Sequence, residues 1–184
     1  MKKTFLFAAL LLVAIDTYAQ SFNDFFADQT LRIDYIFSGN ASQQMVALDE
    51  LSSFDGWAGR RVNLDKVPVR GNGEISIIEP ESRKVIYRQT FSSLFQEWLV
   101  TEEASQLTKS FEATFLLPMP KKEVEVEITL LDNEGRQQTT MRHKINPNDI
   151  ESMMVLKDDS AQQYVELGDT SNGVIIITLR EEGE

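Results

Sequence analysis

Apolar and polar residues alternate along much of the chain, most regularly in the run Glu-Val-Glu-Val-Glu-Ile-Thr-Leu at 123–130. Successive side chains of a strand point to opposite faces, so this run predicts a strand with one buried and one solvated face. The three glutamates favour a hydrated face that also discourages edge pairing, rather than a cation site. Similar runs predict strands at 30–37, 44–51, 73–79, 84–90, 111–117 and 137–144.

Turn-forming residues separate these runs. Pro80-Glu81-Ser82 lies between two apolar runs, as in a hairpin. Asp132-Asn133-Glu134-Gly135 also predicts a hairpin turn, because it lacks the spaced acidic ligands and closing glutamate of a calcium loop. Gly71-Asn72-Gly73 precedes a strand rather than a helix, so we interpret it as a turn and not as a phosphate loop.

One segment, 92–99, has helical rather than strand periodicity. Ser92 or Ser93 is a suitable N-cap, and Leu94, Phe95 and Trp98 fall on one face. We expect this helical excursion to lie across one sheet or over its end. Many short strands with one helix predict a mainly β fold, an antiparallel β-sandwich.

The pattern changes after Asn146-Pro147-Asn148. A strand at 150–156, a short helix at about 158–167 and a continuous apolar strand at 174–177 form a small C-terminal βαβ pattern. Four branched residues in a row favour burial on both faces, so this strand must pack on the sandwich or on another protein. The candidate docking residues are Val174, Ile175, Ile176 and Ile177.

The first residues have the three parts of a secretory signal peptide: Met1-Lys2-Lys3, an apolar run at 5–15, and Thr17-Tyr18-Ala19. We therefore expect cleavage after Ala19 and an exported protein that is periplasmic, outer-membrane associated or extracellular. The predicted organisation is a signal peptide at 1–19, a β-sandwich at 20–147 and a tail at 148–184. No apolar run of spanning length occurs in the expected mature chain.

Composition excludes several function classes. The 184 residues contain 18 Lys+Arg and 29 Asp+Glu, a formal net charge of -11, one His and no Cys. Disulfides and a thiol nucleophile are impossible, and one His cannot supply a typical zinc site. The acidic balance argues against nucleic-acid binding. No H-E-x-x-H, G-x-S-x-G or phosphate-loop motif occurs, so we expect no enzyme activity, no metal and no cofactor. A hydrolase with an unrecognised carboxylate pair is the weakest alternative.

Two places carry candidate chemistry. Trp57, Arg60 and Arg61 share a short stretch with two glycines, and Lys66 and Arg70 follow. An indole face and guanidinium forks suit an acidic peptide, a sugar acid or a partner loop. The structural interpretation, which we favour, is that Trp57 plugs the sandwich end while the arginines pair with acidic strands. The single histidine, at position 143, is either a pH-responsive surface residue or, as we favour, a strand residue with a hydrogen-bond partner.

Four ordered motifs carry a family resemblance. They are Thr30-Leu31-Arg32-Ile33-Asp34-Tyr35-Ile36-Phe37-Ser38-Gly39-Asn40, Gly56-Trp57-Ala58-Gly59-Arg60-Arg61, Phe91-Ser92-Ser93-Leu94-Phe95-Gln96-Glu97-Trp98 and Phe115-Leu116-Leu117-Pro118. Together they resemble the N-terminal domain of IgA-peptidase-type zinc metallopeptidases. The resemblance implies a non-catalytic β-sandwich that precedes a zinc peptidase domain. Because these 184 residues contain no H-E-x-x-H, no catalytic residue carries over.

The tail has a second resemblance, over residues 149–178. The stretch 149–161, Tyr164 and the run Asn172-Gly173-Val174-Ile175-Ile176-Ile177-Thr178 are similar to a segment of the plug domain of TonB-dependent receptors. That family usually has glycine after the tyrosine, whereas Val165 stands here. In such receptors a β-sandwich often precedes the plug. The barrel is missing from this sequence, so the resemblance implies a plug-like unit and not a transporter.

These observations predict a non-enzymatic binding module of the cell envelope. The sandwich would recognise a ligand or protein, and the tail would dock on an envelope partner. The expected partners are an envelope protein or glycan, including an outer-membrane receptor or a secreted peptidase. The alternative function is an accessory subunit that acts in trans for a secreted zinc metallopeptidase.

Overall fold

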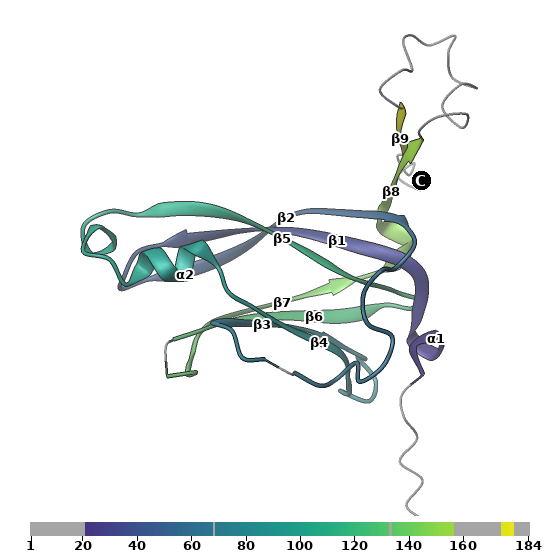
Figure 1. Ribbon diagram of the computed structural model, residues 1–184, viewed down its shortest axis with the longest axis horizontal. Helices are drawn as coiled ribbons and strands as arrows, with labels where there is room; N and C mark the ends of the chain where they lie inside the picture. Colours follow the sequence, from purple (N-terminus) through teal and green to yellow (C-terminus); the bar gives the residue numbers. More distant parts are fainter. Residues whose placement is uncertain (1–20, 68, 133, 157–173, 179–184) are drawn as a thin grey trace, which may run out of the picture.

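Two β-sheets face each other in the computed structural model, which describes residues 21–67, 69–132, 134–156 and 174–178 (Figure 1). The first sheet has the strand order β5-β1-β2-β8-β9 and the second β4-β3-β6-β7. The strands are β1 Phe26–Gly39, β2 Gln44–Asp55, β3 Gly73–Ile78, β4 Val85–Phe91, β5 Lys109–Pro120, β6 Val124–Leu131, β7 Gln137–Ile145, β8 Glu151–Leu156 and β9 Val174–Thr178. The predicted mainly β fold is confirmed.

Strand β1 supplies the centre of the core. Its alternate residues Leu31, Ile33, Tyr35 and Phe37 have no solvent exposure. Strand β1 pairs antiparallel with β2 on one edge and with β5 on the other. The facing layer comes from the inward residues of the second sheet, Ile75, Ile77, Val126, Ile128 and Leu130. Each such side chain contributes about 1.5–3 kcal/mol on burial, so this interface between the sheets holds the sandwich together.

The glutamate row of β6 lies on the outer face of the second sheet, as the alternation predicts. However, β6 lies between β3 and β7, so the row does not protect a sheet edge as we expected. Cations of neighbouring segments neutralise it: Lys144 lies 3.1 Å from Glu123, Arg83 lies 3.1 Å from Glu125, and Arg142 pairs with Glu127. Within the described ranges, no group of His, Cys, Asp and Glu has the arrangement of a metal site.

The predicted helix is α2, Leu94–Leu99, at one end of the first sheet (Figure 1). Ser93 caps it, since its hydroxyl accepts a hydrogen bond from the Gln96 N–H at 3.3 Å. The buried Gln96 amide donates to the carbonyls of Leu131, at 2.7 Å, and Asn72. Phe95 packs on the first sheet. The remaining helical segments are α1 Phe22–Phe25, which we did not predict, η1 Glu103–Ser105 and η2 Pro147–Asp149.

Both predicted hairpins are confirmed. Strands β3 and β4 pair antiparallel, as do β6 and β7. In the second turn, Asp132 Oδ1 accepts hydrogen bonds from the N–H groups of Glu134 and Arg136, at 2.9 and 2.8 Å. Gly135 has φ +81°, which glycine adopts without strain. The acidic tetrapeptide therefore builds a turn.

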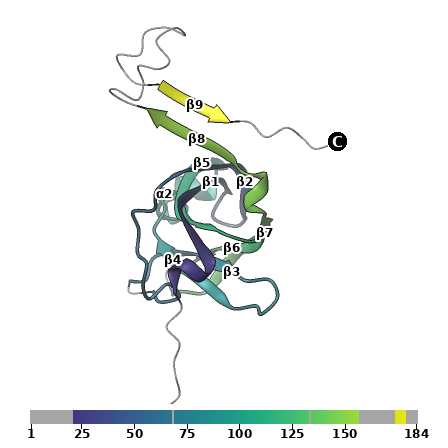
Figure 2. The same cartoon turned by 90° about the vertical axis from the view of Figure 1, so that its right-hand side faces the viewer.

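The tail strands β8 and β9 form where we predicted, but their arrangement differs. They pair antiparallel, from Ser152 opposite Thr178 to Leu156 opposite Val174, which corrects the parallel pair of a βαβ unit. Strand β8 joins the first sheet by a short parallel pairing, with Ser52 opposite Glu151 and Ser53 opposite Ser152. Figure 2 shows the two strands extending beyond the stacked sheets.

Two predicted segments, the signal peptide at 1–19 and the helix at 158–167, lie outside the described residues. None of the helices in the described part of the chain is long and apolar enough to cross a membrane.

Candidate ligand-binding and docking sites

Trp57 follows β2 and closes one end of the sandwich. Its backbone N–H donates to Asp28 Oδ1 at 3.0 Å, and its indole N–H donates to the Arg60 carbonyl at 3.1 Å. The ring is 9% exposed and meets Tyr87 edge-on, at 6.1 Å between centroids. A Cβ at Gly59 would lie 2.1 Å from the indole, so only glycine fits there. These contacts favour the structural interpretation, in which the Trp57 ring fills the end of the sandwich.

Arg60 is engaged with the protein backbone. Its guanidinium donates to the carbonyls of Lys66 at 2.5 Å, Leu64 at 3.0 Å and Arg88. The same group lies over the Tyr87 ring, 5.0 Å from the centroid. Arg60 thus ties the connection after β2 to strand β4. We had expected the arginines to pair with acidic strands, and for this residue the partners are carbonyls instead.

Arg61 does pair with an acidic residue of β1. Its Nη2 lies 2.5 Å from Asp28 Oδ1 and donates to the Trp57 carbonyl at 3.0 Å. The guanidinium also lies over the Phe22 ring at 4.8 Å. The hydrogen bond from Arg61 lowers the pKa of Asp28, and the hydrogen bond from the Trp57 N–H lowers it further. With 44% of its side chain exposed, Arg61 is accessible but already neutralised.

The structure therefore brings Trp57, Arg60 and Arg61 together, as the two glycines of the stretch suggested. Their contacts are structural, because they join the segment after β2 to strands β1 and β4. Ligand binding by these three residues stays a prediction. Of the two downstream cations, Lys66 is exposed and its Nζ lies 3.5 Å from an Asp65 carboxylate oxygen. Arg70 lines a separate cavity.

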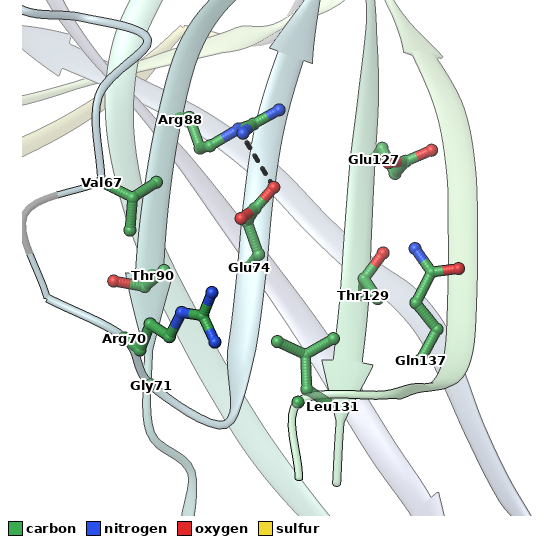
Figure 3. A pocket seen from close by; sticks show the side chains of 11 residues that line it. Val67, Arg70, Gly71, Glu74, Arg88, Thr90, Glu127, Thr129, Leu131 and Gln137 are labelled. Atoms are coloured by element: carbon green, nitrogen blue, oxygen red, sulfur yellow. Dashed lines mark ion pairs between the residues drawn. The ribbon is translucent and has the colours of Figure 1, made fainter.

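Arg70 lines a cavity of about 460 Å³ on the outer face of the second sheet (Figure 3). The floor comes from β3, β4 and β6, and the walls come from the connection after β2 and from the β6–β7 turn. Figure 3 shows Arg70 reaching in from one wall, with Thr129 and Leu131 opposite on β6. The sequence did not predict this cavity, because its lining residues come from separate segments of the chain. Of its lining residues, Arg70 was noted as a candidate cation, whereas Gly71 and Glu127 were interpreted as parts of a turn and of a solvated face.

His143 links the two sheets. Its Nε2 and the hydroxyl of Tyr35, on β1, are hydrogen bonded at 2.6 Å, with the rings edge-on at 5.7 Å. Burial lowers the pKa of His143 and raises that of Tyr35. The favoured interpretation, a strand residue with a hydrogen-bond partner, is confirmed.

The candidate docking residues 174–177 lie in β9, whose backbone pairs with β8 along one edge. Strand β9 is the last strand in the order of the first sheet. Among the described strands, none pairs with its second edge.

Comparison with protein families matches residues 21–142 to the family described as peptidase M64 N-terminus. The chain belongs to this family. The match confirms the first resemblance, and the M64 N-terminal domain is a non-catalytic part of the M64 peptidases. It ends within strand β7 of the sandwich. A search of curated proteins finds no match. The resemblance of residues 149–178 to a receptor plug stays a prediction.

Proposed function

We propose that this M64 N-terminal domain is an exported, non-enzymatic interaction module of the cell envelope. The sandwich recognises a ligand or protein, and the tail at 148–184 docks on an envelope partner. Membership in a non-catalytic family supports the first half of this proposal. The signal-peptide pattern of residues 1–19 supports export.

The observation that carries the docking role is the second edge of β9, with which no described strand pairs. A strand edge presents a row of backbone N–H and C=O groups that another strand can satisfy, and proteins normally cover, shorten or charge such an edge. Strand β9 does the opposite, since Val-Ile-Ile-Ile is uncharged and strongly strand-forming. A partner that adds one strand to β9 would extend the first sheet beyond the sandwich.

The test is capture from native envelope extract by the mature chain, 20–184, and by its Ile176→Pro variant, with Ile176→Val as the matched control. Proline removes a backbone donor from β9, whereas valine keeps it. The captured protein is identified by mass spectrometry, purified and bound again. We expect binding by the mature chain and the valine variant, and loss with proline. Equal capture by all three would refute docking through β9.

The second candidate function is an accessory subunit that acts in trans for a secreted zinc metallopeptidase. The observation in its favour is the family match, which spans nearly the whole sandwich. Adding the protein to such a peptidase should change kcat/KM or the range of substrates cleaved. Unchanged kinetics at saturating protein would remove this candidate.

A further inference from the structure

The cavity beside Arg70 is lined by charged side chains of both signs. Two guanidinium groups and two carboxylates line it. Arg88 lies 3.1 Å from Glu74, and Glu127 pairs with Arg142 on the neighbouring strand. These pairs neutralise both carboxylates. Arg70 forms no hydrogen bond or ion pair within the part of the chain that the structure describes. The cavity therefore keeps one unpaired positive charge in a protein of net charge -11.

An unpaired arginine that faces a cavity favours an anionic ligand group such as a carboxylate, because its planar fork matches two carboxylate oxygens and stays charged at every physiological pH. On the β6 part of the floor, opposite Arg70, lies the hydroxyl of Thr129, which is hydrogen bonded to the Thr140 hydroxyl at 3.0 Å and keeps capacity for a further bond, and Gln137 adds an amide (Figure 3). Hydroxyl and amide groups both donate and accept hydrogen bonds. The ligand should therefore combine one carboxylate with several hydroxyl groups.

An acidic peptide fits less well. A peptide that binds as an extended strand needs a free sheet edge. Of the floor strands, β3 and β6 are interior in their sheet, and the outer edge of β4 is already occupied at Arg88, whose N–H donates to the Leu64 carbonyl at 2.8 Å. Peptide side chains also need apolar lining, and Val67 and Leu131 are the large apolar residues among those that line the cavity. At about 460 Å³ the cavity is within the range of small-molecule sites.

We infer that this cavity binds a sugar acid, with Arg70 as the carboxylate-binding residue. This inference rests on the proposed recognition role of the sandwich and specifies its ligand class. It is independent of the tail, because no lining residue belongs to β8 or β9.

The experiment titrates the mature chain with glucuronate and with N-acetylneuraminate, and with glucose as the neutral counterpart, by heteronuclear NMR. We expect both or one of the acids to shift backbone amides at 70–74 and 127–137. We expect that acid to bind at least about tenfold more tightly than glucose, as a charge-assisted pair requires. Arg70→Gln should remove this preference, and Arg70→Lys should restore part of it.

Arg83→Gln is the matched control, because it removes an exposed arginine of the β3–β4 turn that does not line the cavity. It should leave binding unchanged. The inference is overturned if neither acid binds, if glucose binds equally well, or if Arg70→Gln binds like the parent chain. Any of these outcomes leaves capture through β9 intact, so the two proposals fail separately.

Discussion

The hydrogen bond between Tyr35 and His143 offers the sharpest test of how the sandwich is held together. Tyr35→Phe removes one hydroxyl and keeps the ring, which packs edge-on against Phe115 at 5.8 Å. The imidazole then loses the partner that it has at 2.6 Å across the two sheets. A buried polar group left without its partner costs about 1–3 kcal/mol. We expect the free energy of unfolding to fall by this amount, which shifts the urea midpoint by roughly 1 M.

The same pair predicts a pH dependence. Burial lowers the pKa of His143 in the folded state, so the unfolded chain binds a proton more readily near the ordinary value of 6.5. The contribution of His143 to stability is therefore fully present above pH 6.5 and is lost as the pH falls toward its folded pKa. His143→Gln keeps a hydrogen-bonding side chain but removes the titration.

Urea unfolding followed by circular dichroism, at pH values above and below 6.5, tests both effects. The parent chain should lose more stability than His143→Gln as the pH falls. Tyr35→Phe should have a lower free energy of unfolding than the parent chain at every pH. Wild-type stability for Tyr35→Phe would show that the hydrogen bond carries no net energy. An equal pH slope in His143→Gln would assign the slope to other groups.

Three further substitutions test the packing and the hydrogen bonds around the candidate sites. Gly59→Ala adds a methyl group 2.1 Å from the Trp57 indole, and should cost about 1–3 kcal/mol by overpacking and shift the tryptophan fluorescence. Arg60→Lys leaves one ammonium where a guanidinium reaches three carbonyls, and should lower the free energy of unfolding by about 1–3 kcal/mol. Gln96→Leu removes the hydrogen bonds that the amide donates to the Leu131 and Asn72 carbonyls, of which the Asn72 carbonyl keeps the bond from the Leu131 N–H; it should cost about 1 kcal/mol per lost hydrogen bond and speed hydrogen exchange in α2.

Exposed neighbours supply the controls for these three variants. Ala58→Ser, Arg83→Lys and Glu97→Gln change exposed positions and should stay within about 0.5 kcal/mol of the parent chain. If Gly59→Ala were as stable as Ala58→Ser, the close contact between position 59 and the Trp57 ring would be contradicted. Equal stability of Arg60→Lys and Arg83→Lys would mean that the carbonyl contacts of Arg60 are not needed.

The sequence predicted the strands well, because one-sided burial leaves a two-residue alternation that survives in the residue types. It could not predict which strands are central. The glutamates of 123–127 looked suited to a sheet edge, yet β6 is interior, because neighbouring strands supply cations such as Arg83 and Arg142. Strand neighbours are a property of the fold as a whole, and a single run does not contain them.

The candidate site shows the same limit. Trp57, Arg60 and Arg61 lie together as predicted, because they are close along the chain. The acceptors of Arg60 are backbone carbonyls, which every residue has, so no residue type marked them. The cavity at Arg70 combines several distant segments, and only the cationic side chain itself gave a signal.

Strand β1 has a consequence for how the protein is made. Its residues 26–39 are synthesised near the start of the chain, but one of its two partners is β5, at 109–120. Leu31 cannot pair with Leu117 until β5 has been synthesised, so the middle of the first sheet is completed late. Until then an apolar strand has one bare edge, the state in which β-proteins aggregate. Folding speed should therefore be governed by closure of this long loop, and a chain interrupted before residue 120 should need a chaperone to remain soluble.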